Sequence, residues 1–144
     1  MQPVAAELNA PQVARILLVI GDLGFGGAER GVITLVNGLV KRGLDVHVAT
    51  FSGLVPLASE LVEPSRLHVL RGSVLALIHL ARTLQTRVMH GFLLDAEILV
   101  CLAAWACKDV VVLGSERSSR HHYRLWQRLL YRLSTQNMQL CIAN

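Results

Sequence analysis

The chain of 144 residues contains few charged and aromatic residues, few cysteines, and no long apolar run. Charged residues make up 17% of it and aromatic residues 5%, whereas hydrophobic residues make up 53%. This composition excludes intrinsic disorder and can fill the core of one ordinary domain. The longest apolar runs, Val74–Ala81 and Ile98–Cys107, are much shorter than the roughly 20 residues that span a bilayer. A transmembrane helix is therefore not expected.

Cysteine is scarce and unpaired in the sequence. Cys101, Cys107 and Cys141 give an odd number and form no CxxC pair. This pattern excludes a disulfide framework and a cysteine-based zinc site, and it is typical of a reducing compartment. The short apolar run Ile16–Ile20 ends at Gly21 rather than at a cleavage site for secretion. We therefore expect a cytoplasmic domain without a bound metal.

The positive charge is concentrated in one segment. Residues 1–114 carry equal numbers of acidic and basic residues, so the net charge of +4 arises from residues 115–144. One basic segment is narrower than the broad basic face of a nucleic-acid-binding protein, and we expect no nucleic-acid partner. An anionic membrane surface or a phosphate-bearing substrate fits the segment at least as well.

Short β-branched runs alternate with segments of helical periodicity. Strands are predicted at Arg15–Ile20, Asp45–Phe51, Leu67–Leu70, Arg87–His90, Val110–Gly114 and Leu140–Ala143. Helices are predicted at 28–42, Leu57–Val62, Val74–Thr86, Asp95–Cys107 and Tyr123–Thr135. The alternation predicts an α/β fold over residues 15–144, a Rossmann-like doubly wound parallel sheet of about six strands, after a flexible leader at 1–14.

Ligands of such sheets bind outside the carboxyl ends of the strands, so the glycine-rich segment Gly21–Gly27 is the first candidate loop. It precedes a predicted helix, whose free N–H groups and dipole attract anions. No Lys-Ser or Lys-Thr pair follows the glycines, which excludes a P-loop. Glu29 replaces the third glycine of the dinucleotide fingerprint, and no acid ends the second strand, which argues against NAD. A tight turn without a ligand is the alternative.

Several motifs together resemble the start of glycosyltransferase family 4. The longest is ILLVIGDLGFGGAERGVITLVNGLVKRGLDVHVATF at Ile16–Phe51, which contains the GGAER core and KRG. VMHGFLLDA at Val88–Ala96, VVLGSERSS at Val111–Ser119 and CIAN at Cys141–Asn144 follow in the family's order. The resemblance covers the chain from Arg15 onward.

The resemblance implies one half of a GT-B architecture, namely the N-terminal, acceptor-side domain of a retaining enzyme. Such an enzyme transfers a hexose from a nucleotide-diphosphate sugar to a lipid-linked or polysaccharide acceptor, without a cofactor or a metal. The family's donor-binding C-terminal domain, with its E-x7-E motif, has no counterpart in these 144 residues. We therefore expect the chain alone to be inactive, and the intact enzyme to act in polysaccharide biosynthesis.

The resemblance assigns substrate-binding roles within the glycine-rich loop. It implies that the N–H groups of Gly26 and Gly27 face the donor diphosphate or the acceptor head group. Glu29 is a further binding candidate, although a carboxylate in the first helical turn also stabilises the helix dipole without any ligand.

His90 and Asp95 are the catalytic candidates. His90 ends the predicted fourth strand, so we expect it at the rim of the cleft, where a histidine can donate and accept protons near neutral pH. In the family a histidine of an HxH segment faces the sugar; Phe92 occupies the second histidine position, and Asp95 a later family position. Asp95 can accept a hydrogen bond from a hydroxyl. The alternatives are a buried structural histidine and a helix N-cap.

The last candidates surround the predicted fifth strand and the basic helix. Glu116 and Arg117 follow that strand at the ligand edge, where an arginine fork suits a phosphate or a carboxylate; the alternative is a salt bridge between loops. The basic helix carries a stripe of arginines opposite an apolar face expected to pack on the core. Such a stripe is either solvated or lies on anionic lipid at the inner face of the plasma membrane. It comprises Arg120, Arg124, Arg128 and Arg132, and the apolar face Leu125, Trp126, Leu129, Leu130 and Leu133.

Two other functional classes remain open from the sequence. The chain can be a non-catalytic module, truncated or dependent on a separately encoded partner domain. It can also be a nucleotide-binding Rossmann domain unrelated to sugar transfer. His47, His68 and His79 fall on predicted strands or helix faces without evident partners, and we interpret them as structural.

Overall fold

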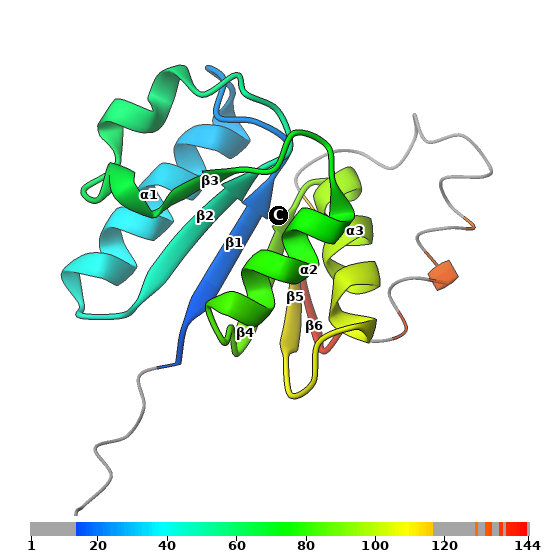
Figure 1. Ribbon diagram of the computed structural model, residues 1–144. Coiled ribbons are helices and arrows are strands. Elements are labelled where there is room, and N and C mark those ends of the chain that lie inside the picture. The colour runs from blue at the N-terminus through cyan, green and yellow to red at the C-terminus, as the bar shows by residue number, and fades with distance from the viewer. Residues whose placement is uncertain (1–13, 117–128, 130–131, 134–135, 137, 144) are drawn as a thin grey trace, which may run out of the picture.

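The computed structural model describes residues 14–116, 129, 132–133, 136 and 138–143 (Figure 1). The strands are β1 (Ile16–Ile20), β2 (Val46–Thr50), β3 (Leu67–Val69), β4 (Val88–Phe92), β5 (Val111–Glu116) and β6 (Leu140–Ala143). The α-helices are α1 (Gly27–Lys41), α2 (Val74–Thr83) and α3 (Leu94–Trp105), and two 3₁₀ helices lie at Pro56–Glu60 and Pro64–Arg66.

All six strands are parallel and form one sheet in the order β3-β2-β1-β4-β5-β6. The chain builds outward from β1 to β3 and then returns to the other side of β1 with β4. The order therefore reverses between β1 and β4, which is the switch point where open α/β sheets bind ligands. The predicted Rossmann-like doubly wound fold is confirmed.

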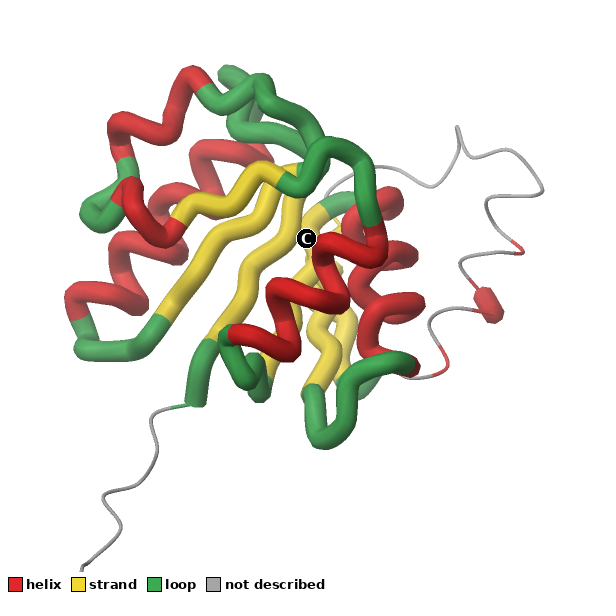
Figure 2. The backbone as a smooth tube through the Cα atoms, viewed as in Figure 1, coloured by secondary structure: helices red, strands yellow, loops and turns green. Residues whose placement is uncertain are grey.

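Helices cover both faces of the sheet, as the tube in Figure 2 shows. α1 packs on one face through Val32, Ile33 and Val36, against strand residues such as Leu18 and Val48. α2 and α3 pack on the other face, against a second set of strand residues. That set includes Leu17, Val19, Ala49, Met89 and Val112. Because β1 is buried between the two layers, its side chains Leu17 to Ile20 are fully inaccessible, as its continuous apolar sequence predicts.

α2 ends three residues earlier than predicted. The N–H of Thr86 donates to the carbonyl of Ala81, and the N–H of Gln85 to that of Arg82, while Gln85 adopts a φ of 52°. This is a Schellman ending, in which the left-handed residue after the helix is usually glycine. The sequence gives no glycine at this position, and the predicted helix therefore ran on to Thr86.

β4 and β5 extend further than predicted, and this changes the position of two candidates. β4 continues to Phe92 because Phe92 pairs with Ser115 of β5, and β5 continues to Glu116 because Glu116 pairs with Ala143. His90 therefore lies within β4 and not at its end, and Glu116 is the last residue of β5 rather than part of the following loop. The expected position of His90 at the rim is wrong.

The predicted basic helix lies mostly outside the described residues. Leu129, Arg132 and Leu133 are described as helical, and all three are exposed. Leu129 is 62% and Leu133 51% exposed, so these two do not pack on the core as predicted. Within the described part of the chain, no helix has the length and apolar character needed to cross a membrane.

Candidate functional site

The loop between β1 and α1 is held against the loop that follows β2. The carbonyl of Gly21 accepts from the N–H groups of Phe51 and Ser52 at 3.1 and 2.9 Å. Leu23 is fully buried below the loop, and its N–H donates to the Leu54 carbonyl at 2.9 Å. Asp22 accepts from the N–H of Gly24 at 2.8 Å. These bonds fix the base of the loop and leave its tip, Phe25 to Gly27, exposed.

The carboxylate of Glu29 lies over the start of α1. Gly26 is the N-cap residue and has no side chain with which to cap the helix. A Cβ on Gly26 would collide with the Glu29 carboxylate, which is folded back beside the backbone of Gly26. Glu29 stands at the third helical position, from which an acidic side chain reaches back over the cap. The charge that favours this helix end is therefore supplied by the protein itself, which opposes the binding of a phosphate at the same place.

The turn between β4 and α3 is tight and strained. A Cβ on Gly91 would stand 2.7 Å from Cα and 2.9 Å from N of Glu97, so only glycine permits this approach of α3. Leu93, the N-cap of α3, has φ 68° and ψ 158°, a region that is essentially restricted to glycine. Its N–H donates to the Ser115 carbonyl at 3.2 Å. The turn is thus bound to the end of β5.

His90 lies buried beside this turn. Its Nε2 is 2.7 Å from the Ser115 hydroxyl oxygen, and its ring stacks on Phe92 with centroids 4.2 Å apart. Burial lowers the pKa of His90 to about 4. The imidazole is therefore neutral near pH 7 and shares one hydrogen bond with the Ser115 hydroxyl. Ser115 was not singled out in the sequence, because a serine that follows an apolar strand carries no distinguishing signal.

Glu97 was also missed in the sequence. It is fully buried in the first turns of α3, and its Oε1 lies 3.0 Å from the position of a Cβ on Gly114. Gly91 and Gly114 are paired neighbours on β4 and β5, so two adjacent glycines make room for α3 and for this carboxyl group. Burial, and secondarily Glu97, raises the pKa of the Cys101 thiol to about 11. Cys101 is therefore an inert core residue.

The remaining candidates are separated. Asp95 is exposed in the first turn of α3 and is not its N-cap, because Leu93 occupies that position. Arg30, beside Glu29, lies 3.9 Å from Glu60 and is 58% exposed. The loop tip with Glu29 and the turn with His90 and Asp95 both lie at the carboxyl end of the sheet, after the adjacent strands β1 and β4. Arg117, Arg120, Arg124 and Arg128 lie outside the described residues.

Two of the histidines interpreted as unpartnered form a pair. His47 Nδ1 and His68 Nε2 are 3.0 Å apart. Ala49 of β2 pairs with His68 of β3, and His47 lies two residues before Ala49, so the two rings lie on the same face of the sheet. His47 Nε2 lies 3.4 Å from Asp45. Burial lowers the pKa of both histidines. No group of three or more His, Cys, Asp and Glu residues suited to a metal occurs within the described ranges.

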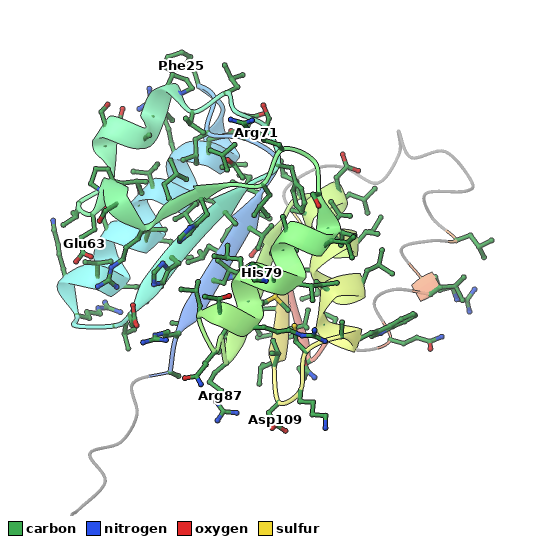
Figure 3. The ribbon with its side chains drawn as sticks, in the orientation of Figure 1. Phe25, Glu63, Arg71, His79, Arg87 and Asp109 are labelled. Atoms are coloured by element: carbon green, nitrogen blue, oxygen red, sulfur yellow. The ribbon has the colours of Figure 1, made fainter. Side chains whose placement is uncertain are left out.

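In Figure 3, Phe25 and Arg71 lie toward the carboxyl end of the sheet, and Arg87 and Asp109 lie toward its amino end. No known family model matches this chain. No curated protein matches it either.

Proposed function

We propose that this chain is the acceptor-side domain of a retaining sugar transferase of the GT-B type. The observation that carries the proposal is the Glu29 carboxylate folded over Gly26 at the exposed tip of the β1–α1 loop. Together with the resemblance of GGAER and the later motifs to glycosyltransferase family 4, it supports a site for hydroxyl groups at the switch point of the sheet.

The chemistry of the carboxyl end favours sugar hydroxyls over a diphosphate. Glu29 and the exposed Asp95 are hydrogen-bond acceptors for hydroxyl groups, whereas both repel phosphate. The donor diphosphate is thus assigned to groups outside this loop, and the glycines at 26 and 27 serve a close approach of the acceptor. This revises the sequence-based role of Gly26 and Gly27, for which both ligands were open.

His90 acts in this proposal as a positioning residue. It is 7% exposed and bonded to Ser115, so it touches no acceptor directly. The neutral ring fixes Ser115, whose carbonyl in turn accepts from the strained turn at Leu93. Asp95, two residues further along, then takes the position nearest to an acceptor hydroxyl. The proposed catalytic role passes from His90 to Asp95.

NMR titration of the ¹⁵N-labelled chain tests the proposal. Unlabelled lipid-free oligosaccharide acceptors, UDP, GDP and NAD are the probes. We expect saturable shifts at the amides of 24–30 and 92–97 with an oligosaccharide, and weaker or no shifts there with the nucleotides. Glu29→Gln and Asp95→Asn should each weaken oligosaccharide binding about threefold to tenfold, because each removes a charged acceptor.

Arg42→Gln, in the exposed segment after α1, is the matched control and should leave the titration unchanged. Tight binding of NAD at 24–30 would contradict the proposal and favour the dinucleotide-binding alternative. Turnover of a nucleotide sugar by the purified chain would contradict the expectation that it is inactive by itself.

A further inference from the structure

A cavity of about 640 Å³ opens at the amino end of the sheet, opposite the proposed acceptor site. It lies between the start of β1, the end of α2 and the segment that follows α3. Its volume falls within the range of small-molecule sites. Four basic residues, Arg15, Arg82, Arg87 and Lys108, line it together with a single carboxylate, Asp45.

The cations at this cavity are only partly neutralised. Asp45 is bonded to Arg15 at 2.7 Å and also to Arg66 outside the cavity. Arg82 donates to the Ala106 carbonyl and, like Lys108, has no ion pair in the part of the chain that the structure describes. Arg87 is 3.9 Å from Asp109, which is 81% exposed. Two cations are thus without a counter-charge, and a third has a weak one.

Two helix ends help to explain why cations gather at this cavity. α2 and α3 both end here, and each helix C-terminus carries about half a negative charge, which attracts cations. Two helix ends and Asp45 together offset about two of the four positive charges. Arg66, outside the cavity, is paired with Glu63 as well as with Asp45. Among the groups that line the cavity, about two positive charges are left, which is the complement of a dianion.

The wall of the cavity also contains a buried hydroxyl group. Thr86 lines the cavity, is 4% exposed, and its Oγ1 has no hydrogen-bond partner among the described residues. An unpaired buried hydroxyl is costly, but the Thr86 oxygen itself is closed off from the open space, so the cations at the rim carry the recognition of a ligand. The neighbouring Gln85 adds an amide to the lining.

We propose that this cavity binds a small phosphate monoester, between Arg82, Arg87 and Lys108, at a site separate from the proposed acceptor site. The guanidinium of Arg82 is held in place by Ala106, and Lys108 supplies a mobile point charge. The organic body of the ligand occupies the space toward Gln85 and Val110.

NMR titration with ribose 5-phosphate tests the proposal, with ribose as the uncharged control. We expect saturable shifts at the amides of 85–88 and 107–110, and none with ribose. Raising NaCl from about 50 to about 300 mM should weaken binding, because the cations are exposed at the rim. Absence of these shifts, or equal shifts with ribose, would overturn the proposal.

Substitutions locate the charge. Arg82→Gln should weaken binding about tenfold, and the exposed Lys108→Gln about threefold. Lys41→Gln is the matched control, because Lys41 ends α1 at the same end of the sheet and does not line the cavity. Unchanged affinity in the Arg82→Gln, Lys108→Gln double variant would overturn the proposal. The acceptor titration at 24–30 should remain normal in these variants, which separates the two sites.

Discussion

The two ends of the sheet differ in charge and in packing. At the carboxyl end, glycines bring the backbone close, Leu93 is strained, and the half-buried Glu29 and the exposed Asp95 lie near the switch point. At the amino end, helices stop, arginines and a lysine gather, and a cavity opens. In one fold, close packing and acceptor groups are therefore found where the helices begin, and cations and open space where they end.

The largest effect is expected from filling the tight contact at the carboxyl end. Gly91→Ala places a Cβ against backbone atoms of Glu97, so α3 must move, and the free energy of unfolding should fall by about 3 kcal/mol. Gly38→Ala, within α1 and with open space around it, should instead raise it by about 0.8 kcal/mol. Urea unfolding measures both, and equal effects would refute the contact.

The next effect is a dependence on pH through His90. Its folded pKa of about 4 lies below the ordinary 6.5, so between these values the unfolded chain binds a proton that the folded chain does not. The free energy of unfolding should therefore fall as the pH drops through this window, by about 3 kcal/mol in total. His90→Gln should flatten the profile, leaving the slope due to His47 and His68, whose pKa values are lowered in the same direction. Identical wild-type and variant profiles would exclude this role.

At the amino end, a substitution should stabilise the chain. Thr86→Val replaces an unpaired buried hydroxyl with a methyl group, which should raise the free energy of unfolding by about 1 kcal/mol. Thr83→Val, on the exposed side of the end of α2, is the control and should change it by less than about 0.5 kcal/mol. Thermal and urea unfolding give the comparison, and a loss of stability in Thr86→Val would reveal a bond to the hydroxyl.

The smallest effect concerns the cap of α1. Glu29→Gln removes the charge that lies over Gly26, so the helix dipole loses its partner and the free energy of unfolding should fall by about 0.5 kcal/mol. The same change should strengthen the shift of the Gly26 and Gly27 amides by inorganic pyrophosphate, because the repulsion is removed. A weaker response to pyrophosphate would mean that the Glu29 charge does not repel phosphate from this loop.

The strands and helices were predictable because their apolar residues are periodic. β1, β2 and α1 were located to within a residue or two, and the parallel sheet followed from the alternation of strands and helices. The end of α2 was not predictable, because Gln85 fills a left-handed position that glycine usually marks. The burial of His90 depends on how far β4 continues, which is decided by pairing with β5 and not by local sequence.

The candidate site was predictable only as a set of loops. Glycines and polar residues after each strand indicated which loops a ligand would contact, and the structure shows that the strand order reverses between β1 and β4. The contacts of Ser115 and Glu97 arise from residues distant in sequence, and the cavity at the amino end arises from three separate segments. No local sequence pattern predicts contacts between residues that are so far apart in the chain.

The close contact between Gly91 and α3 also restricts movement of the β4–α3 turn, one of the two walls of the switch point; the other wall is the β1–α1 loop. The amides of Leu93 and Glu97 are bonded to Ser115 and Leu93, and α3 cannot slide on Gly91, so these amides should exchange with deuterium only when the whole domain unfolds. The amides of Gly26 and Gly27 begin α1 without an intrahelical partner and should exchange within moments. In the proposed acceptor site, a ligand would therefore contact one wall that is held fixed and one whose amides open readily.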